Sequence, residues 1–129
     1  MIIDSSAVLA ILTGHPESER LLRTAVQGSC RMSAATSVEV GIVADGRSAR
    51  HGERLDALLR TLEVEIEPVT TRQAEIARLA YRRFGRGSGS PAALDFGACF
   101  SYALSVATAE PLLFVGDDFA HTDVAAQPY

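Results

Sequence analysis

The chain has 129 residues, enough for one domain that buries roughly two-thirds of its unfolded surface. Its net charge of −4 argues against broad electrostatic binding of nucleic acid, and no apolar run approaches the ~20 residues of a membrane span. No secretory signal is expected, and the two cysteines, Cys30 and Cys99, lie in apolar surroundings, which favours a reduced, cytoplasmic protein.

The first predicted strand, residues 1–4, ends in a carboxylate. Three apolar residues lead directly into Asp4, and Ser5 or Ser6 is expected to cap the helix that follows and ends before Gly14. Aspartate is itself a favoured helix cap, so a purely structural role for Asp4 is one interpretation. The other interpretation is that Asp4 takes part in the chemistry of a functional site.

The next part of the chain repeats this alternation of helix and strand. A helix that begins near Glu17 carries Leu21, Leu22 and Val26 on one side, and we expect that side to be buried. Residues 32–34 form a brief strand candidate. These segments extend the pattern of short strands separated by helices.

Glu39 is the second acid that follows a strand candidate. Thr36 or Ser37 is expected to cap its helix, which would place Glu39 in the first turn, where the helix dipole favours a carboxylate. Leucine spacing predicts an amphipathic helix at residues 50–62, and alternating side chains predict a strand at residues 64–69.

The last third of the chain is predicted to hold two helices and one strand. The helices are expected from residue 71 to about 84 and over residues 94–107, with a glycine-rich loop between them. The second helix is nearly apolar and should be central. The strand at residues 111–116 precedes Asp117 and Asp118, which taken singly are ordinary turn residues.

Strands that alternate with helices indicate a single α/β domain over residues 1–129, with a short central parallel sheet flanked by helices. In open parallel sheets the functional crevice lies outside the carboxyl ends of the strands. Asp4, Glu39, Asp117 and Asp118 all follow strand candidates. We therefore expect these four acids to converge at one edge of the sheet.

Converging carboxylates point to a metal site. Like charges within a few ångströms repel one another, and a hard cation such as Mg²⁺ or Mn²⁺ relieves that repulsion because it prefers carboxylate oxygens. Such an ion can polarise a phosphoryl oxygen and lower the pKa of water. The chemistry that follows most directly is metal-assisted hydrolysis of a phosphodiester.

Four segments, which follow one another along essentially the whole chain, can be compared together with the motifs of known families. They read MIIDSSAVLAIL, SAATSVEVGIV, GRGSGSPAALDFGACFSYALS and PLLFVGDDFAHTDV. Together they resemble the PIN-domain ribonucleases of the VapC toxin type. The resemblance implies a compact parallel-sheet domain that cuts RNA with a divalent metal. It also implies homodimers or toxin–antitoxin hetero-oligomers, with a small cognate VapB-like antitoxin that blocks the site.

Carried over residue by residue, the resemblance makes Asp4 the first metal ligand and Glu39 the second acid. Asp117 or Asp118 would be the last acid, and the motif does not decide between them. With Asp4 holding the metal, the remaining acids would complete its shell or position water.

Residues near the glycine-rich loop are candidates for RNA contacts. All basic residues of the chain are arginines, and Arg82, Arg83 and Arg86 cluster here. Arginine suits phosphate, although a solvated helix end explains the cluster equally well. Ser6 is a further candidate for substrate binding. Four aromatic residues at helical spacing are predicted to be core rather than base-stacking platforms; they are Tyr81, Phe84, Phe96 and Phe100.

One expected ligand is missing. Ala98, in LDFGAC, stands where the family carries its third aspartate, and Asp95, three residues earlier, is a candidate substitute because the two would share a helix face. The chain is an engineered inactive variant, a natural enzyme that uses Asp95, or a natural member that has lost catalysis and keeps partner binding. Weaker metal binding is expected in each case.

Two other functions are rivals to this one, and the second is discounted. The first is a protein that binds antitoxin or RNA without cutting, which Ala98 favours. The second is a haloacid-dehalogenase-like phosphatase, which also begins with an aspartate at a strand end. That chemistry expects a second aspartate two residues on, where this chain has Ser6.

Overall fold

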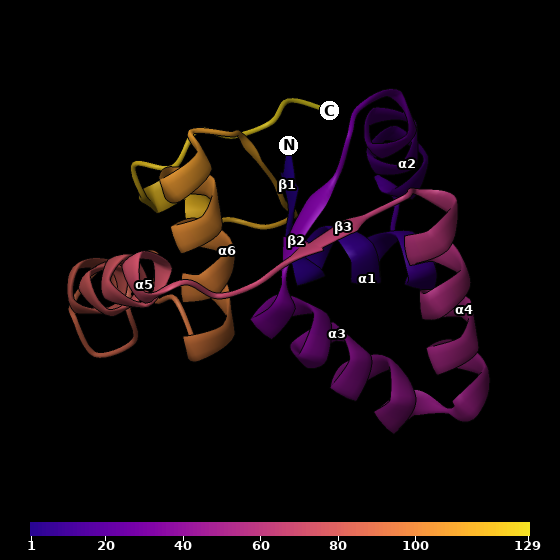
Figure 1. The fold of residues 1–129 in the computed structure, drawn as a ribbon, viewed down its shortest axis with the longest axis horizontal. Coiled ribbons are helices and arrows are strands. Elements are labelled where there is room, and N and C mark those ends of the chain that lie inside the picture. The colour runs from indigo at the N-terminus through magenta and orange to yellow at the C-terminus, as the bar shows by residue number, and fades with distance from the viewer.

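The computed structural model describes residues 1–129, with four short parallel strands at its centre (Figure 1). The strands follow the order β3-β2-β1-β4, and all three pairings are parallel. Their bounds are β1 (Ile2–Ile3), β2 (Arg31–Ser33), β3 (Glu65–Glu67) and β4 (Leu112–Leu113). The predicted α/β domain with a parallel sheet is confirmed.

Six helices surround the strands. They are α1 (Ser5–Thr13), α2 (Ser18–Gln27), α3 (Ala34–Arg47), α4 (Ala49–Thr61), α5 (Thr71–Phe84) and α6 (Phe96–Thr108), with a 3₁₀ turn, η1 (Phe119–His121), near the end. Figure 1 shows α5 and α6 on one side of the strands and α1, α2 and α4 on the other. None of these helices has the length and apolar character that crossing a membrane requires.

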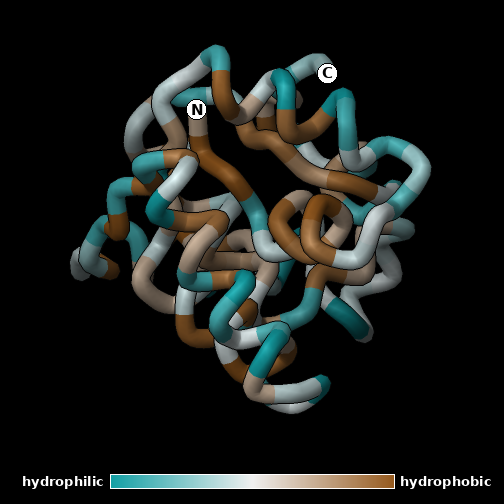
Figure 2. Tube along the Cα trace, turned by 90° about the vertical axis from the view of Figure 1, so that its right-hand side faces the viewer, coloured by the Kyte–Doolittle hydropathy of each residue, from teal (hydrophilic) through white to brown (hydrophobic).

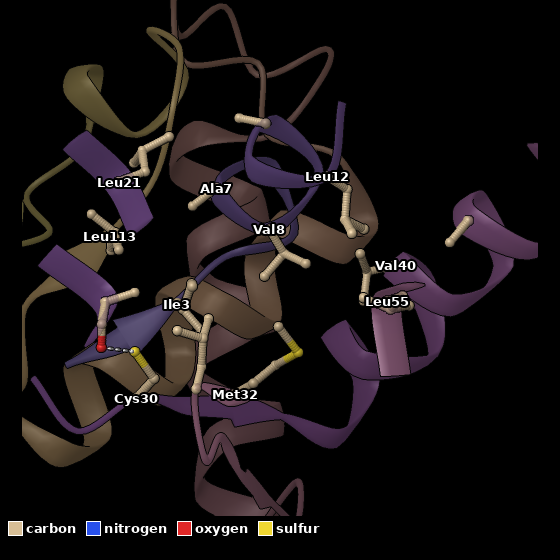
Figure 3. Close-up of a cluster of buried hydrophobic side chains, with 14 residues drawn as sticks. Ile3, Ala7, Val8, Leu12, Leu21, Cys30, Met32, Val40, Leu55 and Leu113 are labelled. Atoms are coloured by element: carbon tan, nitrogen blue, oxygen red, sulfur yellow. Dashed lines mark hydrogen bonds between the residues drawn. The ribbon is translucent and has the colours of Figure 1, made fainter. Parts of the chain in front are cut away.

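The sheet separates two hydrophobic clusters. Consecutive strand residues point to opposite faces, so Ile2 belongs to the cluster under α5 and α6, while Ile3 belongs to the cluster under α1 to α4. Figure 3 shows the second of these, where Ile3, Val8 and Met32 meet between strands and helices. In Figure 2 the backbone just after the N-terminus, which includes β1, has the brown colour of hydrophobic residues.

Two helices begin differently from the prediction. Asp4, and not Ser5 or Ser6, caps α1: its carboxylate accepts the backbone N–H of Ser6 at 3.0 Å. Ser33, the last residue of β2, caps α3 by accepting the N–H of Ala35 at 3.3 Å. Because α3 begins earlier than predicted, Glu39 lies in its second turn. The helix dipole, which favours carboxylates in the first turn, therefore does not explain why a glutamate stands at position 39.

Several apolar residues predicted to be buried are exposed. On α2, Leu21 and Ala25 face the core, so Leu22 and Val26, one position further round the helix, are 37% and 62% exposed. Phe96 is 76% exposed because it is the first residue of α6 and no preceding turn covers its ring. Phe96 packs edge to face on Phe100, with ring centroids 5.0 Å apart.

Candidate metal and phosphodiester site

A cleft of about 290 Å³ opens where the carboxyl ends of β1, β2 and β4 meet their helices. Four acids line it: Asp4, Glu39, Asp95 and Asp118. Asp117, the neighbouring acid, does not line it, although both aspartates after β4 are exposed. Three of the four acids predicted to converge therefore line the same cleft, and Asp118 lines it where Asp117 does not.

Asp4 is held by two hydrogen bonds and is only 4% exposed. Its Oδ2 accepts the N–H of Ser6, and its Oδ1 accepts the hydroxyl of Ser101 on α6 at 2.5 Å. The structural and chemical interpretations of Asp4 therefore do not exclude each other. The helix cap fixes a carboxylate that also lines the cleft.

Glu39 reaches from α3 to the first turn of α6. Its Oε1 accepts the hydroxyl of Ser5 at 2.9 Å, and its carboxylate lies against the backbone of Gly97. Partial burial raises the pKa of Glu39, and the nearby charges of Asp95 and Asp4 raise it further, while the Ser5 hydrogen bond opposes the shift. Burial is the largest cause of this pKa shift, and the smaller effects of Asp95 and Asp4 indicate that both acids lie near Glu39.

Asp95 caps α6 and does not occupy a turn of it. Its Oδ1 accepts the backbone N–H of Ala98 at 2.8 Å, so the two residues do not stand on one helix face as predicted. Both nevertheless line the cleft. Asp95 is exposed, and capping already uses one of its oxygens.

The donor chemistry of the cleft suits a hard divalent cation, because its polar side chains are carboxylates and hydroxyls. However, no three Asp, Glu, His or Cys side chains come together in a group that could hold a metal ion. At position 98 the cleft wall carries a methyl group. The type of donor therefore fits a hard cation, although these side chains are not grouped as a ready-made set of ligands.

The predicted RNA contacts lie apart from the cleft, with one exception. Arg82, Arg83 and Arg86 are exposed and do not line it. Arg83 forms an ion pair with Asp123 at 3.4 Å and lies over the ring of Phe84. Ser6 does line the cleft, where its hydroxyl oxygen accepts the N–H of Val115 at 3.1 Å.

Three residues that support the acids were missed from sequence. Ser101 and Thr36 are fully buried, and Gly97 leaves the space that Glu39 fills. A serine inside the nearly apolar α6 was the available signal, because a buried hydroxyl needs a partner. The identity of that partner depends on the tertiary structure and cannot be inferred from the spacing of residues in the sequence.

The family model for the PIN domain matches residues 1–125. The chain belongs to the PIN-domain family. It is 47% identical over 126 residues to "Ribonuclease VapC28" of Mycobacterium tuberculosis, covering 96% of this chain and 95% of the relative. It is 45% identical over 128 residues to "Ribonuclease VapC" of Mycolicibacterium smegmatis, covering 98% of each. The predicted resemblance to VapC ribonucleases is confirmed.

Solved structures support the same fold. A toxin–antitoxin complex from Klebsiella pneumoniae contains a chain with a TM-score of 0.74 at 19% identity, covering 99% of this chain and 97% of that one. VapBC2 from Rickettsia felis, bound to a promoter DNA fragment, gives a TM-score of 0.67 at 12% identity, covering 98% and 96%. The fold that this chain shares with these two structures thus extends over 98–99% of its length.

Proposed function

We propose that this protein is the toxin of a type II toxin–antitoxin system, an endoribonuclease that hydrolyses RNA phosphodiester bonds with Mg²⁺ or Mn²⁺. The observation that carries the proposal is the gathering of Asp4, Glu39 and Asp118 in one cleft of a chain whose relatives are VapC ribonucleases. Nucleases of this family generally depend on a divalent metal. We further propose that Ala98 impairs catalysis in this chain.

Each acid has a role in this proposal. Asp4 is the principal ligand, Glu39 and Asp118 complete the metal shell or position water, and Asp95 is the nearest substitute for the absent carboxylate. When bound, the cation would stabilise charge on the scissile phosphate and lower the pKa of water. The chain itself supplies a fixed Asp4 and a Glu39 oriented by Ser5.

Substrate binding then depends on few positive charges. Arg82, Arg83 and Arg86 are proposed to contact the RNA backbone away from the acids, and Ser6 to contact it within the cleft. Because the whole chain is acidic, binding should rest on these local contacts rather than on its net charge.

The proposed partner is a VapB-like antitoxin, in a hetero-oligomer that can include a toxin dimer, in the cytoplasm. Exposed apolar side chains adjoin the acids: Val38 is 61% and Ile42 67% exposed, and both line a groove with Glu39 and Phe96. An apolar surface continuous with the catalytic cleft suits a protein that covers both. The toxin–antitoxin complexes among the structural neighbours agree with this choice.

A catalytically silent protein that binds antitoxin or RNA is the second candidate. Ala98 favours it, together with the lack of any three acids grouped to hold a metal. The phosphatase alternative has lost its basis, because the chain belongs to the PIN-domain family and carries Ser6 where the second aspartate would be.

Cleavage of a cellular RNA pool tests the proposal, with and without Mg²⁺ or Mn²⁺. This chain, Ala98→Asp and Asp95→Ala should be compared, with Asp118→Asn and Asp117→Asn as a matched pair in the active background. We expect Ala98→Asp to cut, and Asp118→Asn to abolish cutting while Asp117→Asn does not. If this chain cuts and Asp95→Ala stops it, Asp95 has replaced the missing ligand. If neither this chain nor Ala98→Asp cuts although both fold, the silent binding protein is the correct function.

A further inference from the structure

A chain of three polar side chains runs beneath the acid cleft. Thr36 on α3 and Ser101 on α6 are both 0% exposed, and their hydroxyl oxygens lie 3.1 Å apart. Ser101 then donates to Oδ1 of Asp4 at 2.5 Å. We propose that Ser101, supported by Thr36, is a positioning residue that fixes the Asp4 carboxylate for metal binding, an inference that rests on the function proposed above.

The direction of the hydrogen bonds follows from counting protons. A hydroxyl has one proton to donate, and Ser101 gives its proton to the Asp4 carboxylate, which can only accept when ionised. The bond between Thr36 and Ser101 must therefore run from the Thr36 hydroxyl to the Ser101 oxygen. Two donors aligned in this way polarise each other and strengthen the bond to the carboxylate.

The same bonds leave Asp4 with capacity for a cation. Each carboxylate oxygen has two lone-pair sites. Oδ1 uses one for Ser101, and Oδ2 uses one for the N–H of Ser6, so each oxygen keeps one. Holding both oxygens fixes the rotation of the carboxylate about its Cβ–Cγ bond, which a single bond would not do. A ligand fixed in this way needs no reorganisation when the ion binds.

The position of the two hydroxyls in their helices supports a role in the site. Thr36 lies three residues before Glu39 on α3, and Ser101 lies three residues after Ala98 on α6, so each is one turn from an acid position. The hydrogen bonds between Thr36, Ser101 and Asp4 thus join the end of β1 to α3 and α6, the two helices that carry positions 39 and 98. Apolar residues could fill this buried space without the desolvation cost of two hydroxyls.

The test measures Mn²⁺ affinity and RNA cleavage of the full chain in the Ala98→Asp background. We expect Ser101→Ala to raise the Kd for Mn²⁺ on the order of 10- to 100-fold, as the loss of a hydrogen bond to a metal ligand does elsewhere. Ser105→Ala is the matched control: this serine is also buried on α6, but it donates to the carbonyl of Glu110. It should lower stability without changing the Kd.

A conservative pair at position 36 guards against a variant that fails to fold. Thr36→Val keeps the shape and loses the hydroxyl, whereas Thr36→Ser keeps the hydroxyl. We expect Val to weaken Mn²⁺ binding and Ser to restore it. Equal Mn²⁺ affinity in Ser101→Ala and its parent would overturn the proposal, as would equal losses in Ser105→Ala.

The outcomes separate this inference from the proposed function. A parent that binds Mn²⁺ but leaves RNA intact contradicts the nuclease proposal, while the Mn²⁺ affinities of the variants still decide the role of Ser101. A folded parent that binds no Mn²⁺ overturns the positioning role, because Asp4 would then have no ion to hold.

Discussion

Gly97 determines where the Glu39 carboxylate can lie. A Cβ placed on Gly97 would stand 1.5 Å from Oε2 of Glu39, so any side chain there must displace that oxygen. The displaced atom is the end of a flexible side chain, and the backbone of α6 can stay in place. The glycine therefore serves the site more than the fold.

Gly97→Ala should separate site geometry from stability. Because alanine is the better helix former by up to about 1 kcal/mol, the free energy of unfolding should hold or rise slightly. In the Ala98→Asp background, RNA cleavage and Mn²⁺ affinity should fall at least tenfold because Glu39 is displaced. Gly41→Ala is the control, since a Cβ on Gly41 of α3 meets nothing within 4 Å. Unchanged Mn²⁺ affinity in Gly97→Ala would show that Glu39 is not a ligand.

Ala98 should make the metal-free protein more stable than its aspartate counterpart. A carboxylate at position 98 would join Asp4, Glu39 and Asp118 in one cleft, and like charges at short range oppose folding. We expect Ala98→Asp to lose roughly 0.5–3 kcal/mol in a chelating buffer and to regain stability with Mn²⁺. Thermal melts with and without Mn²⁺ measure this, and Ala98→Asn separates charge from size. A higher melting temperature for Ala98→Asp without metal would contradict it.

At the scale of the elements, one carboxylate connects the C-terminal segment to two helices. Asp123 accepts the hydroxyl of Tyr102 on α6 at 2.5 Å and the guanidinium of Arg83 on α5 at 3.4 Å. The Tyr102 hydrogen bond and the Arg83 charge hold the pKa of Asp123 below its ordinary value of 3.8. Burial raises the pKa of Tyr102 to about 12, helped by the same carboxylate, so its hydroxyl remains a donor at neutral pH.

This arrangement predicts a pH-dependent contribution to stability. The lowered pKa in the folded state means that ionised Asp123 stabilises the fold above pH 3.8, and that this stabilisation is lost as the pH falls below that value. Asp123→Asn keeps an acceptor for Tyr102 but removes the charge. Denaturant unfolding should show the wild type more stable at pH 7, with the difference closing in acid. A constant difference from pH 7 to pH 2 would exclude this ionisation as its source.

The elements were more predictable from sequence than their ends. Alternating apolar strands and amphipathic helices have periods of 2 and 3.6, which a sequence displays directly. Caps are a choice among neighbouring polar residues, so Ser33 could not be separated from Thr36 before the end of β2 was known. The four acids could be named because each follows a strand. That Asp118 lines the cleft and Asp117 does not depends on the turn after β4.

At the scale of the whole molecule, the two thiols lie on opposite faces of the sheet. Cys30 belongs to the cluster under α1 to α4 and Cys99 to the cluster under α5 and α6, and both are free and buried. Burial raises the pKa of Cys30, and burial with the nearby charge of Asp95 raises that of Cys99 to about 11. Neither thiol forms much thiolate at neutral pH.

Thiol labelling should therefore report unfolding of the whole domain. At pH 7.5 an aromatic disulfide reagent should modify the thiols of the native protein far more slowly than those of the unfolded chain. The unfolded chain should release two equivalents of the reagent's coloured thiolate at once, one for each cysteine. Each of the single variants Cys30→Ser and Cys99→Ser should release one equivalent on unfolding. Rapid native labelling in Cys30→Ser would indicate that α6 opens locally at Cys99, which lines an apolar groove with Phe96 and Tyr81.

The sheet order has a consequence for synthesis on the ribosome. β1 lies between β2 and β4, and Ile2 pairs with Leu112. The first strand to be synthesised therefore gains one of its two neighbouring strands only when the last strand has been synthesised. The Asp4 N–H bonds to the carbonyl of Leu113, and the Asp4 carboxylate to Ser101, 97 residues away. A nascent chain therefore has no acid cleft until β4 and Asp118 have left the exit tunnel. A toxic activity built on this cleft would arise only after residues 112–118 have been synthesised and have joined residues 1–4 in the sheet.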